Sequence, residues 1–298
     1  MPKVTIAIPA YKGRFLGDAM ASALAQDYKD IELVVVDDCS PDDVEGVVRG
    51  FDDSRIRYFR NGRNLGGESP AVNWNVCLDY ASGDYFVLLC DDDTLDPRFV
   101  SGVLDLAARY PDCGVFRSPT SLVNAETGLG IGAEPAWPEH EDFDSFARNV
   151  SAGRRHHTIS EFMVRTDLAR SKGGYVVFPA AFYSDDASVL RFADDGGVCS
   201  LQERLVTFRK SADNISSRSD SNVMKSRAAL EYYRWLSTEY GSFASREVLR
   251  DRLDFDLVNF FMWARLRDSL RILALVPSQV WGIRQKAALM RNRLFRDA

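Results

Sequence analysis

Residues 81–93 read ASGDYFVLLCDDD, a polar turn followed by a short apolar run that ends in three consecutive aspartates. Similar β-branched or apolar runs occur earlier in the chain, at 4–8 (VTIAI), 31–36 (IELVVV) and 56–59 (IRYF). Segments with helical spacing of apolar residues separate these runs. Because strands that alternate with helices form parallel sheets, the first hundred residues predict a βαβαβαβ unit of an α/β fold.

Polar, acidic or glycine-rich segments follow the four predicted strands. They are residues 9–11 (PAY), 37–40 (DDCS), 64–67 (NLGG) and 91–93 (DDD). In open α/β sheets, ligands bind in the crevice beyond the carboxyl ends of the strands. We therefore expect these segments to line a binding site.

The three aspartates at the end of the fourth predicted strand indicate a metal site. Asp91, Asp92 and Asp93 would repel one another and resist ionising together unless a cation neutralised them. Oxygen ligands favour a hard divalent ion, Mg²⁺ or Mn²⁺, which in turn holds phosphate oxygens. The alternative is that one aspartate caps the following helix.

The composition excludes disordered, collagen-like and disulfide-dense classes of protein. The 298 residues are 46% hydrophobic and 27% charged, as in an ordinary folded protein. The formal net charge of -6 argues against a nucleic-acid partner, which would require a basic surface. The five cysteines form no CxxC pair, and no apolar leader precedes the first predicted strand, so we expect reduced thiols in a cytoplasmic protein.

Five segments, in this order and spacing, resemble family 2 glycosyltransferases. They are VTIAIPAY (4–11), ELVVVDDCSPD (32–42), NLGGESPAVNWN (64–75), ASGDYFVLLCDDD (81–93) and TLDP (94–97). Gly173-Gly174-Tyr175 and Ser184-Asp185 extend the resemblance, which covers about residues 1 to 210. Neither a GxGxxG nor a GxxxxGK[ST] motif is present, so the sequence supports neither a dinucleotide-binding site nor a P-loop.

The resemblance implies a fold and a division of the chain. The expected fold is GT-A, the Rossmann-like fold of nucleotide-diphospho-sugar transferases, with a mixed sheet flanked by helices. Residues 1–215 would form the glycosyltransferase domain, with a nucleotide-sugar-binding half at 1–96 and an acceptor half at 97–215. Residues 222–298 would form a C-terminal helical extension.

The resemblance also implies a donor-binding pocket. Pro9, Tyr11 and Asp38 would line the base and ribose, with the Asp38 carboxylate accepting a hydrogen bond from a pyrimidine ring NH. Asn64 and Asn73 would add polar contacts to the nucleotide. The alternatives are core packing for Tyr11, helix capping for Asp38 and local backbone contacts for the two asparagines.

The metal-binding DxD motif of the family falls on Cys90, Asp91 and Asp92, so a thiol replaces its first aspartate. Asp92 would be the principal ligand of Mn²⁺ or Mg²⁺, with Asp91 beside it. Asp93 would bind the ion through water or cap the next helix. A histidine that many relatives have near residues 208–216 is Ser211 in this chain.

Glycosyl transfer requires a base that accepts the proton of the attacking hydroxyl, and one carboxylate is sufficient. By resemblance, Asp185 is the catalytic base, with Asp186 as the alternative. Either residue could instead cap the helix predicted to begin at Ser184.

We therefore expect an inverting, metal-dependent glycosyltransferase that moves a sugar from a nucleoside diphosphate to a hydroxyl of a glycan or lipid-linked glycan, in surface polysaccharide or glycoconjugate biosynthesis. One rival is a sugar nucleotidyltransferase, which has a glycine-rich signature near its first strand, unlike IPAYKGRF (8–15). The other is a non-catalytic nucleotide-sugar-binding protein.

The C-terminal segment 261–298 carries eight Lys and Arg against two Asp and Glu. This charge predicts contact with the inner face of the cell membrane, close to a lipid-linked acceptor. The alternatives are a helical lid on the catalytic domain and a homodimer contact. The apolar and basic residues expected at the membrane are Leu270, Ile272, Leu273, Leu275, Val276, Val280, Trp281, Ile283, Arg284, Lys286, Arg291, Arg293 and Arg296.

Overall fold

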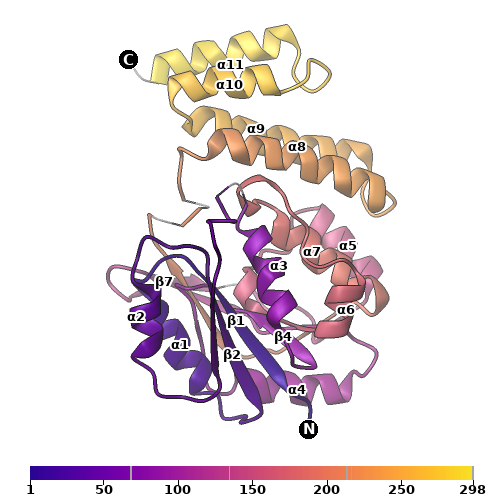
Figure 1. Ribbon diagram of the computed structural model, residues 1–298. Coiled ribbons are helices and arrows are strands. Elements are labelled where there is room, and N and C mark those ends of the chain that lie inside the picture. The colour runs from indigo at the N-terminus through magenta and orange to yellow at the C-terminus, as the bar shows by residue number, and fades with distance from the viewer. Residues whose placement is uncertain (68, 134, 213, 216, 297–298) are drawn as a thin grey trace.

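A computed structural model describes residues 1–298 except 68, 134, 213, 216 and 297–298. Its centre is an eight-stranded sheet in the order β3-β2-β1-β4-β10-β6-β11-β9, flanked by helices (Figure 1). A second sheet of four strands has the order β5-β12-β7-β8. The predicted mixed α/β fold with flanking helices is confirmed.

The N-terminal part of the large sheet is parallel. Strand β1 pairs with β2 on one side and with β4 on the other, and β2 pairs with β3. A helix connects each pair of successive strands, as the alternating pattern predicts. These elements are β1 (Val4–Ala10), α1 (Leu16–Leu24), β2 (Ile31–Asp37), α2 (Val44–Arg49), β3 (Ile56–Arg60), α3 (Ala71–Tyr80) and β4 (Tyr85–Leu88).

The other half of the large sheet is mixed. Strand β10 (Phe162–Arg165) runs antiparallel to β4 and to β6 (Val115–Arg117). Beyond β6 lie β11 (Val198–Ser200) and β9 (His140–Glu141). The smaller sheet consists of β5 (Thr94–Leu95), β7 (Thr120–Asn124), β8 (Gly130–Ala133) and β12 (Val206–Lys210). The helices of this half are α4 (Phe99–Arg109), α5 (Phe143–Ser151), α6 (Thr166–Ser171) and α7 (Ser184–Phe192), with short 3₁₀ turns η1 (Ile159–Glu161), η2 (Pro179–Ala181) and η3 (Ala193–Asp195).

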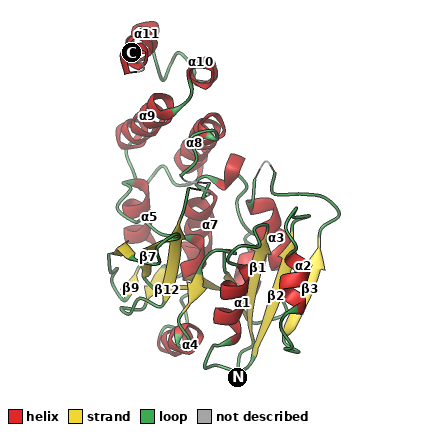
Figure 2. Ribbon diagram, turned by 90° about the vertical axis from the view of Figure 1, so that its left-hand side faces the viewer, coloured by secondary structure: helices red, strands yellow, loops and turns green. Residues whose placement is uncertain are grey.

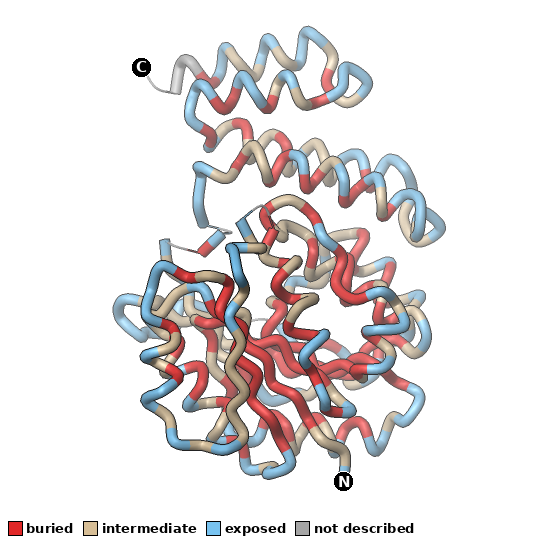
Figure 3. Tube along the Cα trace, viewed as in Figure 1, coloured by how far each residue is buried: buried red, intermediate tan, exposed pale blue. Residues whose placement is uncertain are grey.

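Apolar side chains cover both faces of the large sheet at its central strands β1, β2 and β4, which is why these strands are largely apolar. Along β1, Ile6 and Ile8 point into one core, which includes α1 and α4, and Ala7 points into the other, which includes α3 and α7. All three side chains are fully buried, and Figure 3 shows buried chain concentrated in the sheet. With both faces covered, the strand ends are the edge at which a polar site can form.

In the part of the chain that the structure describes, four helices follow the two sheets and confirm the predicted C-terminal helical extension. They are α8 (Asn222–Glu239), α9 (Arg246–Trp263), α10 (Leu266–Leu275) and α11 (Ile283–Arg296). Tyr232, Tyr233 and Leu249 join the core on the α3 side of the sheet, so α8 and α9 pack against the α/β part of the chain. Helices α10 and α11 lie farther out (Figures 1 and 2). In the described residues, no helix combines the length and hydropathy needed to cross a bilayer.

The predicted membrane-facing set is partly wrong. Ile272, Val276 and Trp281 are almost fully buried in a small core with Leu257 and Phe261 of α9. Their apolar character stabilises the contact between α9, α10 and the segment before α11. Arg293 is also buried and donates to the carbonyl of Ala264. The side chain of Arg296 lies outside the described residues.

Candidate active site

The segment after β4 separates its three aspartates. The Asp91 carboxylate faces the loop after β1, where Oδ2 accepts hydrogen bonds from the backbone N–H groups of Tyr11 and Lys12 at 2.8 and 2.7 Å. Asp91 therefore joins two strand ends. Burial and the charge of Asp92 raise its pKa to about 6, although the two N–H donors oppose this shift.

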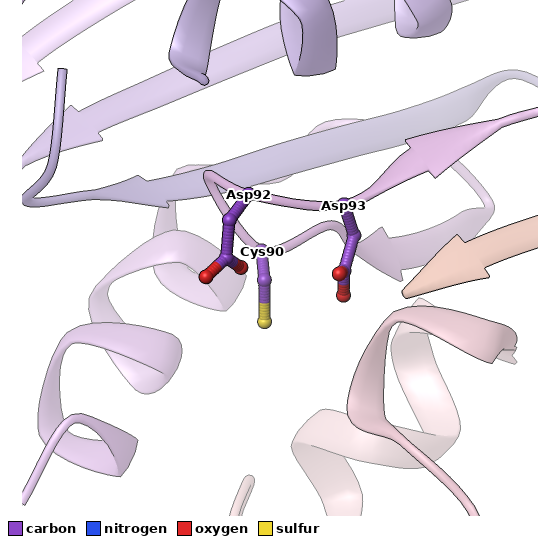
Figure 4. Close-up of side chains that lie close together, drawn as sticks. All are labelled: Cys90, Asp92 and Asp93. Carbon is purple, nitrogen blue, oxygen red and sulfur yellow. The ribbon is translucent and has the colours of Figure 1, made fainter. Parts of the chain in front are cut away.

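Cys90, Asp92 and Asp93 form a group whose ligand atoms all lie within 4.8 Å of one another (Figure 4). Asp93 is fully buried and accepts from Ser160 Oγ at 2.6 Å and from the backbone N–H of Arg209 at 3.2 Å. Asp92 Oδ2 accepts from Asn214 Nδ2 at 3.2 Å and lies 3.8 Å from Lys12 Nζ. Distant parts of the chain thus meet at this group.

The chemistry of this group fits a divalent cation. Burial raises the pKa of Asp92, and burial together with the neighbouring charge of Asp92 raises the pKa of Asp93. Two close carboxylates in a poorly solvated place favour a cation that neutralises them. Burial also raises the pKa of the Cys90 thiol, so this sulfur is a weaker ligand than the carboxylates.

The residues predicted for the donor pocket lie around the ends of β1 and β2. Asp38 is buried, and its carboxylate accepts from the N–H groups of Leu65 and Gly66 at 2.8 and 2.7 Å and from Asn61 Nδ2 at 2.8 Å. A Cβ on Gly66 would lie 2.8 Å from Asp38 Oδ2, so this close approach requires glycine. The Asp38 carboxylate thus shapes the loop after β3.

The other predicted donor-binding residues differ in exposure. Asn73 is buried, and its Oδ1 accepts from Asn61 Nδ2 at 2.9 Å. Because Asn61 Nδ2 also donates to Asp38, Asn73 helps to position this donor. Tyr11 is 41% exposed, so its side chain is accessible to a ligand. Asn64 is exposed and Pro9 is half-buried. The structure brings these residues to one edge of the sheet but gives Asp38 and Asn73 internal partners.

Asp185 and Asp186 occupy the first turn of α7. Asp185 Oδ1 accepts from the backbone N–H of Asp186 at 3.0 Å, and burial raises the pKa of Asp185 to about 6. Burial and the charge of Asp185 raise the pKa of Asp186 well above its usual value. A carboxylate with a raised pKa is a stronger proton acceptor when ionised, as a general base requires.

The turn that holds these aspartates is anchored by the C-terminal helices. Tyr183, the residue before α7, has φ of 66°, a left-handed conformation that is unfavourable for an aromatic residue. Its hydroxyl donates to Asp256 of α9 at 2.6 Å, and its ring stacks on Tyr232 of α8 with centroids 4.5 Å apart. Tyr233 also donates to Asp256, at 2.9 Å. Helices α8 and α9 therefore fix the backbone from which Asp185 projects.

One short segment, residues 157–160, connects two acidic centres. The first is the group of Cys90, Asp92 and Asp93, and the second is the pair Asp185 and Asp186. Ser160 contacts Cys90 and Asp93, since the Cys90 N–H donates to Ser160 Oγ at 3.0 Å. Three residues earlier, His157 Nε2 lies 3.8 Å from Asp186 Oδ1. Three residues of chain span at most about 10 Å, so the backbone positions that contact the two centres lie close together.

Sequence reasoning missed several residues of this site. Lys12, Ser160 and Asn214 contact the aspartates from segments far away in sequence, and no local motif marks them. Arg209 also reaches this site: its backbone N–H donates to Asp93, and its guanidinium lies 2.9 Å from Asp18.

Comparisons with known proteins identify the family. Residues 5–160, more than half of the chain, match the model of glycosyl transferase family 2. The chain therefore belongs to glycosyl transferase family 2 and is a glycosyltransferase.

Two curated relatives match a shorter stretch, about a third of this chain. A GalNAc(5)-diNAcBac-PP-undecaprenol beta-1,3-glucosyltransferase of Campylobacter jejuni is 42% identical over 98 residues, 32% of this chain and 31% of that protein. The succinoglycan biosynthesis protein ExoO of Rhizobium meliloti is 37% identical over 108 residues, 36% of this chain and 30% of that protein. The match thus spans less than a third of the length of either relative.

Solved structures share the fold over almost the whole chain. TarS residues 1–349 of S. aureus, in complex with UDP-GlcNAc, has a TM-score of 0.60 and 16% identity, covering 98% of this chain and 89% of that one. The mannosyltransferase PcManGT of Pyrobaculum calidifontis, in complex with GDP-Man and Mn²⁺, has a TM-score of 0.59 and 15% identity, covering 99% and 80%. The shared fold therefore includes the C-terminal helices.

Proposed function

We propose that this glycosyltransferase transfers a sugar from a nucleoside diphosphate to a hydroxyl group with inversion at the anomeric carbon, and that it needs a divalent cation. The observation that supports the proposal is that one short segment contacts both acidic centres. Asp92 and Asp93 lie at the end of β4, Asp185 lies at the start of α7, and segment 157–160 contacts both centres.

We assign the donor side to the first centre. Cys90, Asp92 and Asp93 would hold Mn²⁺ or Mg²⁺, with Asp91 in a supporting role because its oxygen already binds two backbone N–H groups. When bound, the ion neutralises the diphosphate and stabilises it as the leaving group. Lys12 adds a positive side chain beside Asp92. The presence of Mn²⁺ in the PcManGT complex supports a cation at such a site.

The nucleoside would lie across the ends of β1 and β2. Tyr11 offers an exposed ring for stacking on the base. Three donors already bind the Asp38 carboxylate, and a carboxylate has about four acceptor positions, which leaves it about one for a ring NH. Asn64 is exposed, whereas Asn73 is buried. Asn64 is therefore the stronger candidate for direct contact with the nucleotide.

We assign the proton transfer to Asp185. Its carboxylate accepts the proton of the acceptor hydroxyl as the hydroxyl oxygen attacks the anomeric carbon from the face opposite the diphosphate. One base is sufficient for a single displacement, whereas a retaining double displacement needs a nucleophilic carboxylate as well. The anchored Tyr183 keeps the base oriented, and Asp186 stays beside it as a second carboxyl group.

The pH dependence of transfer follows from the raised pKa of Asp185. The protonated carboxyl cannot accept a proton, so the rate at saturating donor should be constant above the pKa of about 6 and fall below it. Well below this pKa, the decrease should approach about tenfold for each pH unit. A rate profile from pH 4.5 to 8 checks this, and a flat profile across pH 6 would contradict the assignment.

The acceptor class is proposed from the relatives. The Campylobacter protein is named for a PP-undecaprenol acceptor, and the Rhizobium protein for succinoglycan biosynthesis. Both names indicate polysaccharide or lipid-linked glycan assembly. We propose a glycan or lipid-linked glycan acceptor for this chain, reached at the inner face of the cell membrane.

The described surface retains a set of residues suited to anionic lipid. Leu266 and Leu270 of α10 are 43% and 54% exposed and lie one helical turn apart, and Ile283 is 84% exposed. Exposed Arg267 and Arg271 share the same helix. Apolar insertion and about 1 kcal/mol for each basic residue near acidic lipid would together support peripheral binding.

Liposome sedimentation tests this surface. The protein should pellet with phosphatidylglycerol vesicles at low salt, stay in solution with phosphatidylcholine, and be released from the acidic vesicles by high salt. Leu270→Glu should reduce pelleting, whereas Leu129→Glu, at an even more exposed apolar residue of the β7–β8 connection, should not. Protein that remains wholly in the supernatant with acidic vesicles at low salt would refute membrane contact.

Release of nucleoside diphosphate tests the proposed function against its rivals. With a panel of nucleotide sugars and Mn²⁺, one donor should yield nucleoside diphosphate, and EDTA should prevent the release. A non-catalytic binding protein would bind a donor without releasing product. A sugar nucleotidyltransferase would instead produce diphosphate from a nucleoside triphosphate and a sugar phosphate.

A further inference from the structure

His157 is a buried imidazole beside the proposed base. Its side chain is 1% exposed, and its ring is held edge-on by Trp137 and Phe162, with centroids 6.1 and 5.2 Å away. Nε2 lies 3.8 Å from Asp186 Oδ1. The ring therefore points at the first turn of α7 from a fixed position.

Neither ring nitrogen of His157 has a hydrogen-bond partner among the described residues. A buried polar atom without a partner is costly, by about 1–3 kcal/mol, so such atoms usually have a ligand or a water. Burial and the nearby charge of Arg117 lower the pKa of His157 to about 3. The imidazole is therefore neutral at physiological pH, and a neutral imidazole has a lone pair available for a metal ion.

Two carboxylates complete a set of ligands around this lone pair. One ligand atom each from His157, Asp185 and Asp186 lies within 4.8 Å of the other two. The charge of Asp256 raises the pKa of Asp186, and the charge of Arg252 lowers it. One imidazole and two carboxylates match the ligand types of three-ligand zinc sites, in which ligands lie about 2.0–2.2 Å from the ion.

We propose that His157, Asp185 and Asp186 form a second metal site, which takes Zn²⁺ or a similar ion that prefers nitrogen ligands. This site is separate from the group of Cys90, Asp92 and Asp93, where carboxylates favour Mn²⁺ or Mg²⁺. An ion bound to Asp185 occupies the lone pair that accepts the proton, so Zn²⁺ inhibits transfer. The inhibition rests on the proposed function of Asp185, whereas the binding does not.

Zinc titration by calorimetry tests the binding directly. The double variant Cys90→Ser/Asp92→Ala removes the first centre, and in this background about one Zn²⁺ should still bind. Adding His157→Ala should weaken this binding by about 100-fold or more, because loss of even an outer-shell partner of a metal ligand costs about 10- to 100-fold. His156→Ala, at the exposed neighbouring histidine, should leave the affinity unchanged.

His157→Gln provides a second variant that keeps the size of the side chain, and thermal unfolding identifies any variant that fails to fold. If the background protein binds no Zn²⁺, or if folded His157→Ala and His157→Gln proteins bind it as tightly as the background does, the second site does not exist.

Transfer assays separate this inference from the proposed function. With saturating Mn²⁺, micromolar Zn²⁺ should inhibit the wild-type protein and inhibit His157→Gln much less. Zinc binding without inhibition, together with full transfer by Asp185→Asn, would leave the metal site in place and overturn the assignment of the base. Inhibition of equal strength in wild type and His157→Gln would overturn the second site as its cause.

Discussion

Asp185→Asn should lower glycosyl transfer by about 100-fold or more while Mn²⁺-dependent donor binding persists. The amide has the shape of the carboxylate but cannot accept the proton of the acceptor hydroxyl. The Asp185 oxygen that accepts from the Asp186 N–H can be replaced by the amide oxygen, so the first turn of α7 should keep its conformation. Transfer rates at saturating donor and donor affinity by calorimetry together measure this effect.

Asp186→Asn is the matched control, because Asp186 lies in the same turn and has the same change of charge. It should retain much more transfer than Asp185→Asn. If the loss is found with Asp186→Asn and not with Asp185→Asn, the base is the second aspartate. If neither variant loses transfer, no residue of this turn is the base.

Asp92→Ala should abolish Mn²⁺-dependent binding of the donor. Asp92 is the carboxylate that faces Cys90, Lys12 and Asn214, and its removal takes away a main anionic ligand of the proposed cation. The diphosphate would then meet Asp93 with reduced compensation of charge. Calorimetry with Mn²⁺ and the donor found in the release assay measures the loss.

Asp96→Ala controls for general effects of losing an aspartate near β5, since Asp96 pairs with Arg98 and not with the metal group. It should leave donor affinity unchanged. Wild-type donor affinity in Asp92→Ala would show that this residue is not needed to hold the cation.

The N-terminal half of the fold was predictable because its signals are local. Strands β1, β2 and β4 are largely apolar, and a helical segment separates each pair of successive strands from β1 to β4, so the parallel arrangement follows from the βαβ rule. The smaller sheet was not predictable. Strand β5 has two residues and pairs with β12, with Leu95 opposite Val206, so neither length nor local pattern marks it.

In the candidate site, too, local sequence predicts some features, and tertiary packing alone determines others. The run of aspartates after β4 was evident, but its local sequence could not show that Asp91 turns to the N–H groups of Tyr11 and Lys12. That orientation depends on how the ends of β1 and β4 meet. Periodicity in the C-terminal helices likewise could not show that Trp281 packs inward, because the partner face on α9 is set by tertiary packing.

We propose that the two acidic centres have different roles: the first binds the donor and the second accepts the proton. Donor binding and nucleoside diphosphate release should be measured on the same preparations of wild type, Asp92→Ala and Asp185→Asn, with Mn²⁺ and with acceptor present for the release assay. We expect Asp92→Ala to lose both, and Asp185→Asn to bind donor like wild type but release product about 100-fold or more slowly. Equal loss of donor binding in both variants, or wild-type release by either, would contradict the account.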